Sequence, residues 1–175
     1  NPYFVEIGGV VYNKDVTKAI LALNYAKSVV IPNTVVDISY AFKGNNSVEN
    51  VTFEEGTTIT EIGNEAFSNC SSLKSVIIPD SAKSICVYAF WECVSLKTVV
   101  IPYGVTDIFS GAFGHCVALE NIVIPDSVTS IGDSAFEECS KIKEVKLPIN
   151  LTSIGEEAFI ACRGIASIVI PKNVS

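Results

Sequence analysis

The chain has 175 residues, of which 49% are hydrophobic, and its formal net charge is −7. This apolar content is enough for the packed core of one domain, and the length predicts one domain rather than two. The acidic balance and the lack of a lysine and arginine cluster argue against binding to nucleic acid. No apolar run approaches the roughly 18 residues of a membrane span and no signal peptide is visible, so we expect no membrane insertion.

Residues 1–27 do not fit the repeat that governs the rest of the chain. Apolar residues alternate on both sides of Gly8-Gly9, which predicts two strands joined by a tight hairpin turn. Asn13-Lys14-Asp15 predicts a second turn, and the apolar run Ala19–Leu23 follows it. Because the terminal unit of a repeat array needs an atypical outer side, we expect residues 1–27 to be a hairpin that caps the first repeat.

Residues 28–175 form an array of about six repeats with a period of 23 residues. In the later copies proline, phenylalanine, cysteine and isoleucine recur in register: Pro79, Pro102, Pro125, Pro148 and Pro171; Phe67, Phe90, Phe113, Phe136 and Phe159; Cys70, Cys93, Cys116, Cys139 and Cys162; Ile62, Ile85, Ile108, Ile131 and Ile154. The pattern predicts seven strand segments and six Ala-Phe corners. Since the chain begins at Asn1 without methionine and stops within a repeat at Ser175, we expect a piece of a longer protein.

A period of 23 residues is too short for two helices and suits one strand, two turns and a short return segment. Residues 73–78 alternate in polarity and are rich in β-branched residues, which predicts a strand, and Pro79 ends it because proline cannot donate to the ladder. Residues 128–131 predict a short strand on the opposite wall. The Ala-Phe-x-x-Cys corner that follows predicts about one helical or 3₁₀ turn.

One coil points about eight apolar side chains inward, and no single coil can bury them alone. For the coil that starts near residue 119 these are Leu119, Ile122, Ile124, Val128, Ile131, Ala135, Phe136 and Cys139. Stacking places each residue on its equivalent in the next coil, about 4.8 Å away, so we expect ladders of phenylalanine, isoleucine and cysteine through the core.

The combined pattern LxxVxIPxxVxxIGxxAFxxC over residues 28–175 resembles the BspA-like, or Treponema-type, leucine-rich-repeat family. The departures are Glu54 for proline, Asn45 for cysteine, Cys86 for glycine and Ala82 for valine or leucine. The resemblance implies a β-rich, right-handed leucine-rich-repeat solenoid with a parallel sheet on the concave side and short strands and one-turn helices on the convex side. It also implies a surface or secreted protein that serves in adhesion or protein recognition.

Five of the six cysteines recur in step with the core phenylalanines, which favours buried thiols over disulfides or zinc ligands. Cys86 lies outside this series, and we expect it to reach the surface and to be the best candidate for a reactive thiol. His115 is predicted to be a surface residue because other repeats have Asn69, Glu92, Glu138 and Ala161 at its position. A catalytic role is not expected, since no partner carboxylate or nucleophile is marked beside it. The pairs Glu137-Glu138 and Glu156-Glu157 are predicted to be solvated. The sequence thus predicts no catalytic site, no metal site and no cofactor.

Two other features carry weaker signals. For Trp91 we favour packing across the coil over a role as a contact residue. Five N-x-S/T triplets matter only if a eukaryotic host secretes the protein; they begin at Asn45, Asn50, Asn69, Asn150 and Asn173.

The strand alternation aims a column of mostly β-branched residues outward along the concave sheet, with a polar row beside it. One interpretation is a binding face, because large exposed apolar patches tend to mark interaction sites. The alternative is that these residues are present only because β-branched side chains favour sheet formation. The predicted binding residues are Ile77, Thr98, Val100, Asn121, Val123, Glu144, Lys146 and Val169.

The exposed column together with this resemblance implies a non-catalytic module for protein–protein interaction or adhesion, extracellular or at a cell surface, whose partner is a protein such as a host-matrix or cell-surface protein. The alternative is a structural spacer within a larger surface protein. The edge at Ser167–Pro171 is predicted to be an unpaired strand, which invites further coils or end-to-end self-association.

Overall fold

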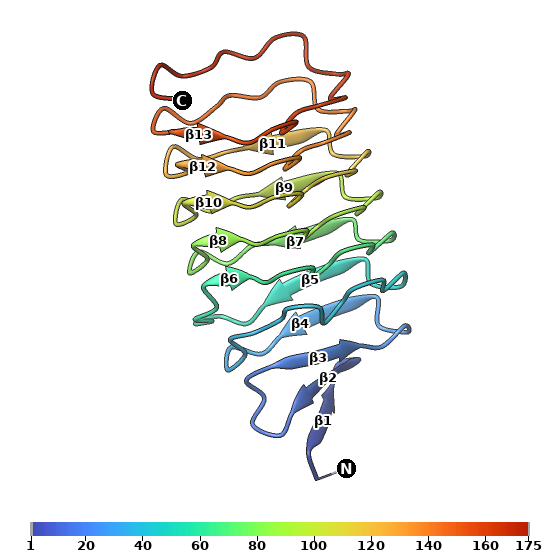
Figure 1. Ribbon diagram of the computed structural model, residues 1–175. Helices are drawn as coiled ribbons and strands as arrows, with labels where there is room; N and C mark the ends of the chain where they lie inside the picture. The colour runs from blue at the N-terminus through green and yellow to red at the C-terminus, as the bar shows by residue number, and fades with distance from the viewer. Residues whose placement is uncertain (1, 175) are drawn as a thin grey trace.

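The computed structural model describes residues 2–174, so Asn1 and Ser175, the outer limits of the two predicted segments, lie outside the described residues. The chain winds into a stack of similar coils, and successive coils contribute strands to two parallel sheets (Figure 1). The predicted leucine-rich-repeat solenoid is therefore confirmed. Residues 2–174 contain no helix that is long enough and apolar enough to cross a membrane.

The first sheet, here called the first wall, contains the predicted long strands. Its five strands are β4 (Ser28–Ile31), β5 (Asn50–Phe53), β7 (Ser75–Ile77), β9 (Thr98–Val100) and β11 (Asn121–Val123), in the order β11-β9-β7-β5-β4. Equivalent repeat positions pair directly, for example Ile77 with Val100 and Val100 with Val123. The 23-residue period thus fixes the register of the sheet.

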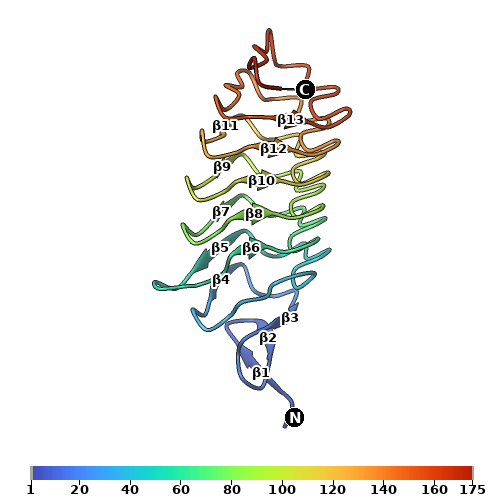
Figure 2. The ribbon, with the colours of Figure 1, turned by 60° about the vertical axis from the view of Figure 1, so that its left-hand side comes forward.

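The second wall is a parallel sheet of short strands, as the return segments predict. Its members are β6 (Glu61–Ile62), β8 (Ser84–Ile85), β10 (Asp107–Ile108), β12 (Ser130–Ile131) and β13 (Ser153–Ile154). Figure 2 shows the two walls and the row of corners as three stacked series of segments. The isoleucine that ends each strand pairs with its equivalent in the next coil.

The N-terminal residues form a separate antiparallel sheet of β1 (Phe4–Ile7), β2 (Val10–Asn13) and β3 (Ala19–Ala22). Ile7 pairs with Val10 across the predicted Gly8-Gly9 turn, where both glycines have positive φ, as a two-residue hairpin requires. β3 also joins the first coil, because the Ala22 N–H donates to the carbonyl of Ala41 at 2.7 Å. The block therefore packs on the array, while the division of the chain at residue 27 stays a prediction.

The core is a column of identical side chains stacked coil on coil. Phe42, Phe67, Phe90, Phe113 and Phe136 are fully buried, and all eight inward residues predicted for the coil from Leu119 are buried. Successive ring centroids are 4.9, 5.2, 5.1, 5.4 and 5.1 Å apart from Phe42 to Phe159. These spacings match the separation of neighbouring strands, which confirms the predicted ladders.

The predicted helical or 3₁₀ turn at each corner is wrong. Every corner contains two residues with left-handed backbone four positions apart, for example Glu65 with φ 48° and Asn69 with φ 59°. The N–H of Phe67 between them donates to the carbonyl of Ala89 in the next coil at 2.8 Å. An α-helix needs right-handed residues and bonds to the residue four positions earlier, whereas here alternate N–H groups link the coils. Strained left-handed residues are thus held by the hydrogen bonds between coils.

The first wall has fewer paired strands than the seven segments predicted. Five are strands, whereas 144–146 and 167–169 carry no strand assignment. Among the described residues, no backbone hydrogen bond joins residues 143–147 to the preceding or the following coil on this wall. At the corner and in the second wall, the same coils remain hydrogen-bonded to each other. The Glu138 N–H donates to the Ile160 carbonyl at 2.9 Å, and the Gly155 N–H donates to the Ile131 carbonyl at 2.7 Å. The stack therefore opens on one side only.

Candidate functional site: the outward face of the first wall

The outward face of the first wall carries the predicted apolar column. Strand alternation buries Val76, Val99 and Ile122 and turns the residues after them to solvent. Ile77, Val100 and Val123 are 65%, 70% and 71% exposed and lie side by side in adjacent strands. Three apolar side chains of this size therefore form one continuous exposed strip across β7, β9 and β11.

A polar row runs beside this column in the same strands. Ser75 pairs with Thr98 and Thr98 with Asn121 in the ladder, and the Ser75 hydroxyl donates to the side-chain carbonyl of Asn50 at 2.8 Å. The face thus presents hydrogen-bonding groups next to an apolar strip, which is the mixture that protein interfaces commonly use.

The structure divides the eight predicted binding residues into two groups. Ile77, Thr98, Val100, Asn121 and Val123 lie together on three paired strands. Glu144, Lys146 and Val169 instead line a groove of about 1250 Å³ formed where the last coils separate. Sequence periodicity could not reveal the separation, because residues 143–171 keep the 23-residue spacing. The binding role of all eight residues stays a prediction.

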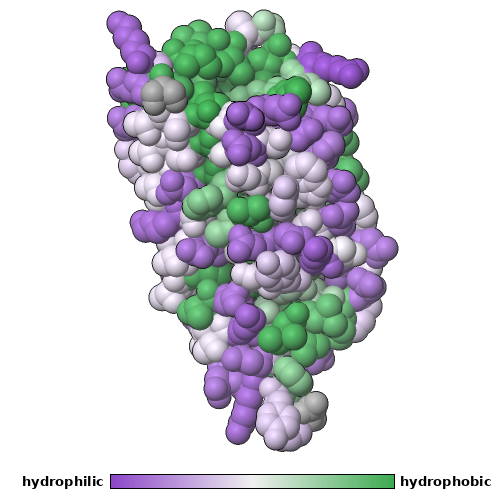
Figure 3. Space-filling view, viewed as in Figure 1, coloured by the Kyte–Doolittle hydropathy of each residue, from purple (hydrophilic) through white to green (hydrophobic). Residues whose placement is uncertain are grey.

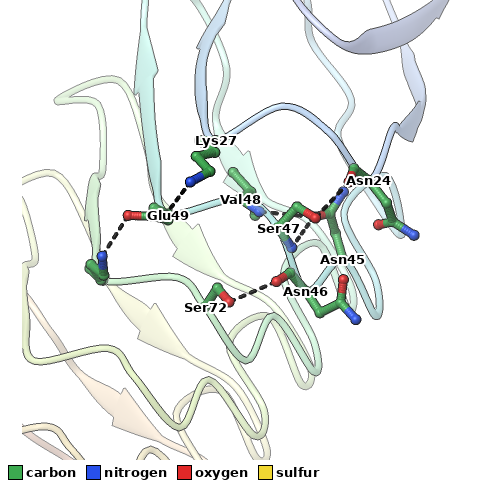
Figure 4. A network of polar contacts seen from close by, with 9 residues as sticks. Asn24, Lys27, Asn45, Asn46, Ser47, Val48, Glu49 and Ser72 are labelled. Atoms are coloured by element: carbon green, nitrogen blue, oxygen red, sulfur yellow. Dashed lines mark hydrogen bonds and ion pairs between the residues drawn. The ribbon is translucent and has the colours of Figure 1, made fainter.

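The edge of the first wall near β5 is tied together by charged and polar side chains (Figure 4). Glu49 accepts from Lys74 at 2.5 Å and lies 3.7 Å from the ammonium of Lys27. The hydrogen bond from Lys74 lowers the pKa of the Glu49 carboxyl, so this group is a carboxylate at neutral pH. The charged side chains at this edge are therefore engaged in ion pairs, whereas Ile77, Val100 and Val123 are exposed.

Asn45 replaces the repeat cysteine in the first corner and forms a buried polar junction. Its amide nitrogen donates to the carbonyls of Ala22 at 3.0 Å and Leu23 at 3.3 Å. Its oxygen accepts from the N–H groups of Ser47 and Val48, as Figure 4 shows. The side chain is 3% exposed. Asn45 therefore links the first coil to β3, and the triplet that starts there is closed to glycan attachment.

The cysteine ladder is structural, as predicted. Each ladder thiol donates to the carbonyl of the phenylalanine in the preceding coil, at 3.0 to 3.1 Å. Burial raises the pKa of Cys70 to about 12 and that of Cys162 to about 11, and it raises the pKa of Cys93, Cys116 and Cys139 as well. All six cysteines are free thiols.

The prediction that Cys86 reaches the surface is wrong. The residue is 8% exposed, with its sulfur 3.8 Å from the Ser84 hydroxyl and 3.9 Å from the Glu61 carboxylate. Burial raises the pKa of Cys86 by more than the hydrogen bond with Ser84 lowers it, and the nearby Glu61 carboxylate adds to the rise. The net rise disfavours the thiolate, so Cys86 is a poor nucleophile in the folded chain.

The environment of His115 differs from the predicted one. Its Nδ1 lies 3.2 Å from the carboxylate of Glu138 and its Nε2 3.9 Å from that of Glu137, so partner carboxylates are present. Glu138 stands 23 residues after His115, and the repeat period alone could have placed the two side by side. The imidazole also packs against Trp91, with ring centroids 4.5 Å apart.

Trp91 packs within the corner row, which confirms the favoured interpretation. Its indole meets Tyr88 edge to face at 5.1 Å and lies over Gly114, where a Cβ atom would come within 2.2 Å of the ring.

The two carboxylate pairs that were predicted to be solvated are Glu137-Glu138 and Glu156-Glu157. Glu138, Glu156 and Glu157 are exposed, and Glu137 is half-buried. No group of three or more histidine, cysteine or acidic side chains suited to a metal occurs among residues 2–174.

Comparison with known proteins gives a consistent picture. A family model described as the BspA type leucine rich repeat region matches residues 17–70 and 60–175 in six copies. A T. pallidum leucine rich repeat protein is 29% identical with a TM-score of 0.82, over 89% of this chain and 75% of that one. None of the curated proteins matches the chain.

Two longer bacterial proteins are also similar. A leucine rich cell surface protein from Faecalibacterium prausnitzii A2-165 is 35% identical with a TM-score of 0.76, over 96% of this chain and 46% of that one. A leucine-rich repeat protein from Bacteroides ovatus ATCC 8483 is 30% identical with a TM-score of 0.65, over 98% and 51%. The chain thus spans about half the length of these two relatives.

Proposed function

Because the chain belongs to the BspA-type leucine-rich-repeat family, we propose that it is a non-catalytic protein-interaction module that binds its partner through the outward face of the first wall. The partner is a protein of a host matrix or cell surface, and the module acts in adhesion outside the cell or at its surface. The cell-surface description of the F. prausnitzii relative supports this location.

The observation that carries the proposal is the exposed strip of Ile77, Val100 and Val123. Apolar side chains that lie singly on a surface are ordinary, whereas a contiguous strip on a rigid sheet offers a partner apolar area that needs no rearrangement. The polar row at Asn50, Ser75, Thr98 and Asn121 adds hydrogen-bonding groups that fix the register of a bound chain.

A double substitution, Val100→Glu with Val123→Glu, tests the proposal. Immobilised wild-type chain and the variant are compared in binding to a panel of purified extracellular-matrix proteins. We expect loss of binding with an unchanged circular dichroism spectrum, because both side chains point to solvent and the core is untouched. Two charges placed in the centre of an interface lower its affinity by more than about a hundredfold.

The matched control is Val36→Glu with Val94→Glu, which adds the same charges at valines 56% and 41% exposed outside the first-wall column. Equal binding by the Val100/Val123 variant and the wild type would show that the strip is not the contact surface. No binding of any panel member by the wild type would instead favour the structural spacer.

A further inference from the structure

The loop between β5 and β6 is longer than the equivalent loop of every other coil. Elsewhere the proline after the first-wall strand lies three positions before the next inward residue, as Pro79 does before Ala82, whereas Glu54 lies five positions before Ile59. Gly56 takes a positive φ of 78° in this loop, which projects beyond the loops of the neighbouring coils (Figure 2). The two extra residues therefore form a projection beside the end of β5.

The first wall opens at the same place. Between β5 and β7 the ladder ends at Val51 and Val76, so Thr52 and Ile77, which occupy equivalent positions, do not pair. Each of them pairs on its other side, Thr52 with a residue of β4 and Ile77 with a residue of β9. A pocket of about 290 Å³ lies between the two strands and the longer loop. The hydrophobic groups that Figure 3 shows over the last coils and toward the N-terminal block lie at the ends of the stack, whereas this pocket lies between two paired coils.

The pocket combines apolar surface with negative charge. Its apolar lining is formed by Phe53, Ile77 and Pro79. All the charged residues of its lining are acidic and exposed: Glu54, Glu55 and Asp80. Within residues 2–174 none of these three carboxylates forms an ion pair. Lys83, the nearest lysine along the chain, lies beside Gly104 in the following coil. The negative charge of the pocket is therefore left for a cation from outside the chain.

A pocket with this lining matches the side chain of lysine or arginine. The methylene stem of such a side chain covers apolar surface, while its charged head forms strong hydrogen bonds with carboxylates. The volume lies near the lower limit of about 300 Å³ for ligand sites, so the pocket holds one side chain rather than a folded segment. We propose that this pocket receives a lysine or arginine side chain of the protein partner.

The inference rests on the proposed function, because Thr52 and Ile77 belong both to the pocket and to the outward face of the first wall. A partner that covers the apolar strip at Ile77 reaches the pocket with its next side chains. The pocket thus selects partners that carry a basic residue beside an apolar segment. The formal net charge of −7 also attracts basic partners before contact.

Nuclear magnetic resonance titration of the whole chain tests the pocket directly. The probes are three acetylated and amidated peptides that share the sequence Thr-Val-Thr-Val and end in lysine, arginine or norleucine. We expect the two basic peptides to shift the amide signals of Thr57, Ile77 and Ser81, with at least about tenfold higher affinity than the norleucine peptide. The preference should shrink as salt is added, because exposed charges are screened. The tighter of the two basic peptides identifies the preferred side chain.

Two charge-removing variants separate the pocket from the general acidity of the chain. Glu55→Gln with Asp80→Asn removes two pocket carboxylates and leaves the hydrogen-bonded Glu54 in place. The matched control, Asp15→Asn with Glu92→Gln, removes the same two charges outside the pocket. All four side chains are exposed, so both variants should keep the wild-type circular dichroism spectrum. We expect the pocket variant to bind all three peptides equally and the control to keep the wild-type preference.

Equal affinity of the wild type for all three peptides overturns this proposal, as does the absence of shifts at the pocket or an equal loss of preference in the control variant. Shifts of the pocket signals by calcium chloride alone would assign the carboxylates to a metal ion and equally overturn it. If Val100→Glu with Val123→Glu binds the matrix panel like the wild type while the basic peptides still prefer the pocket, only the proposed function fails. If that variant loses panel binding and the peptides show no preference, only the present proposal fails.

Discussion

Replacing Phe113 with alanine tests whether the stacked phenylalanine column is what stabilises the solenoid. The ring is fully buried and lies 5.1 Å from that of Phe90 and 5.4 Å from that of Phe136. A Phe→Ala change in a core costs about 3–5 kcal/mol through lost transfer energy and the cavity left behind. The Phe113 N–H is bonded to the Ala135 carbonyl at 2.8 Å, which holds the coil spacing and hinders collapse of the cavity. We therefore expect a loss near the upper end of this range.

The control is Phe159→Ala, at the last ring of the column. Phe159 is half-buried, and among the described residues its ring stacks only on that of Phe136. Its truncation removes less buried area and leaves a site open to solvent, so we expect a loss of about 1–2 kcal/mol. The difference between the two variants isolates the contribution of stacking on both sides.

The assay is guanidinium unfolding followed by far-ultraviolet circular dichroism and by the fluorescence of Trp91. A lower midpoint at unchanged slope reports a loss of stability in the native state. Coincident transitions by the two probes would show that the coils unfold as one unit. A loss below about 1 kcal/mol for Phe113→Ala, or one no larger than that of Phe159→Ala, would refute the idea that the column carries the stability.

Three further outcomes follow from the same stacking. Asn45→Ala should lower the free energy of unfolding by about 2–3 kcal/mol, because it strands the buried Ala22 carbonyl and Val48 N–H, and the midpoint of guanidinium unfolding measures this. Tyr12→Phe should raise it by about 1 kcal/mol, since the buried Tyr12 hydroxyl has no hydrogen-bond partner among the described residues; a lower melting temperature would contradict this. The ladder thiols have a raised pKa in the folded state and ionise near pH 9 in the unfolded state, so above that pH the folded state binds more protons. The free energy of unfolding should therefore be constant below about pH 8 and fall above pH 9 by up to roughly 1.4 kcal/mol per pH unit for each thiol. Cys116→Ala should make the measured fall shallower.

Most of the fold was accessible from the period because stacked coils reuse one set of contacts. The phenylalanine and cysteine positions predicted a core, and the rings of Phe67, Phe90 and Phe113 do stack at strand spacing. The alternation in β7, β9 and β11 likewise predicted which side chains face solvent. When identical coils stack in register, the period and the alternation of the sequence are enough to tell which side chains are buried and which face solvent.

The corners show where local pattern was insufficient. Ala-Phe-x-x-Cys spacing is compatible with a helical turn, because it places three apolar residues on one face. In the structure, Glu65 and Asn69 take left-handed backbone, and Phe67 N–H bonds to the next coil instead. A residue's own preferences do not reveal a hydrogen-bond partner that lies 22 residues away.

The sequence by itself determined the solenoid, its register, its buried ladders and the apolar strip on the first wall, since all of these follow from repeating one 23-residue unit. Only the tertiary structure decided the separation of the last coils, the burial of Cys86 and the left-handed backbone of the corners. These depend on the distances between neighbouring coils, and small shifts there open or close a contact while the period of the sequence stays unchanged.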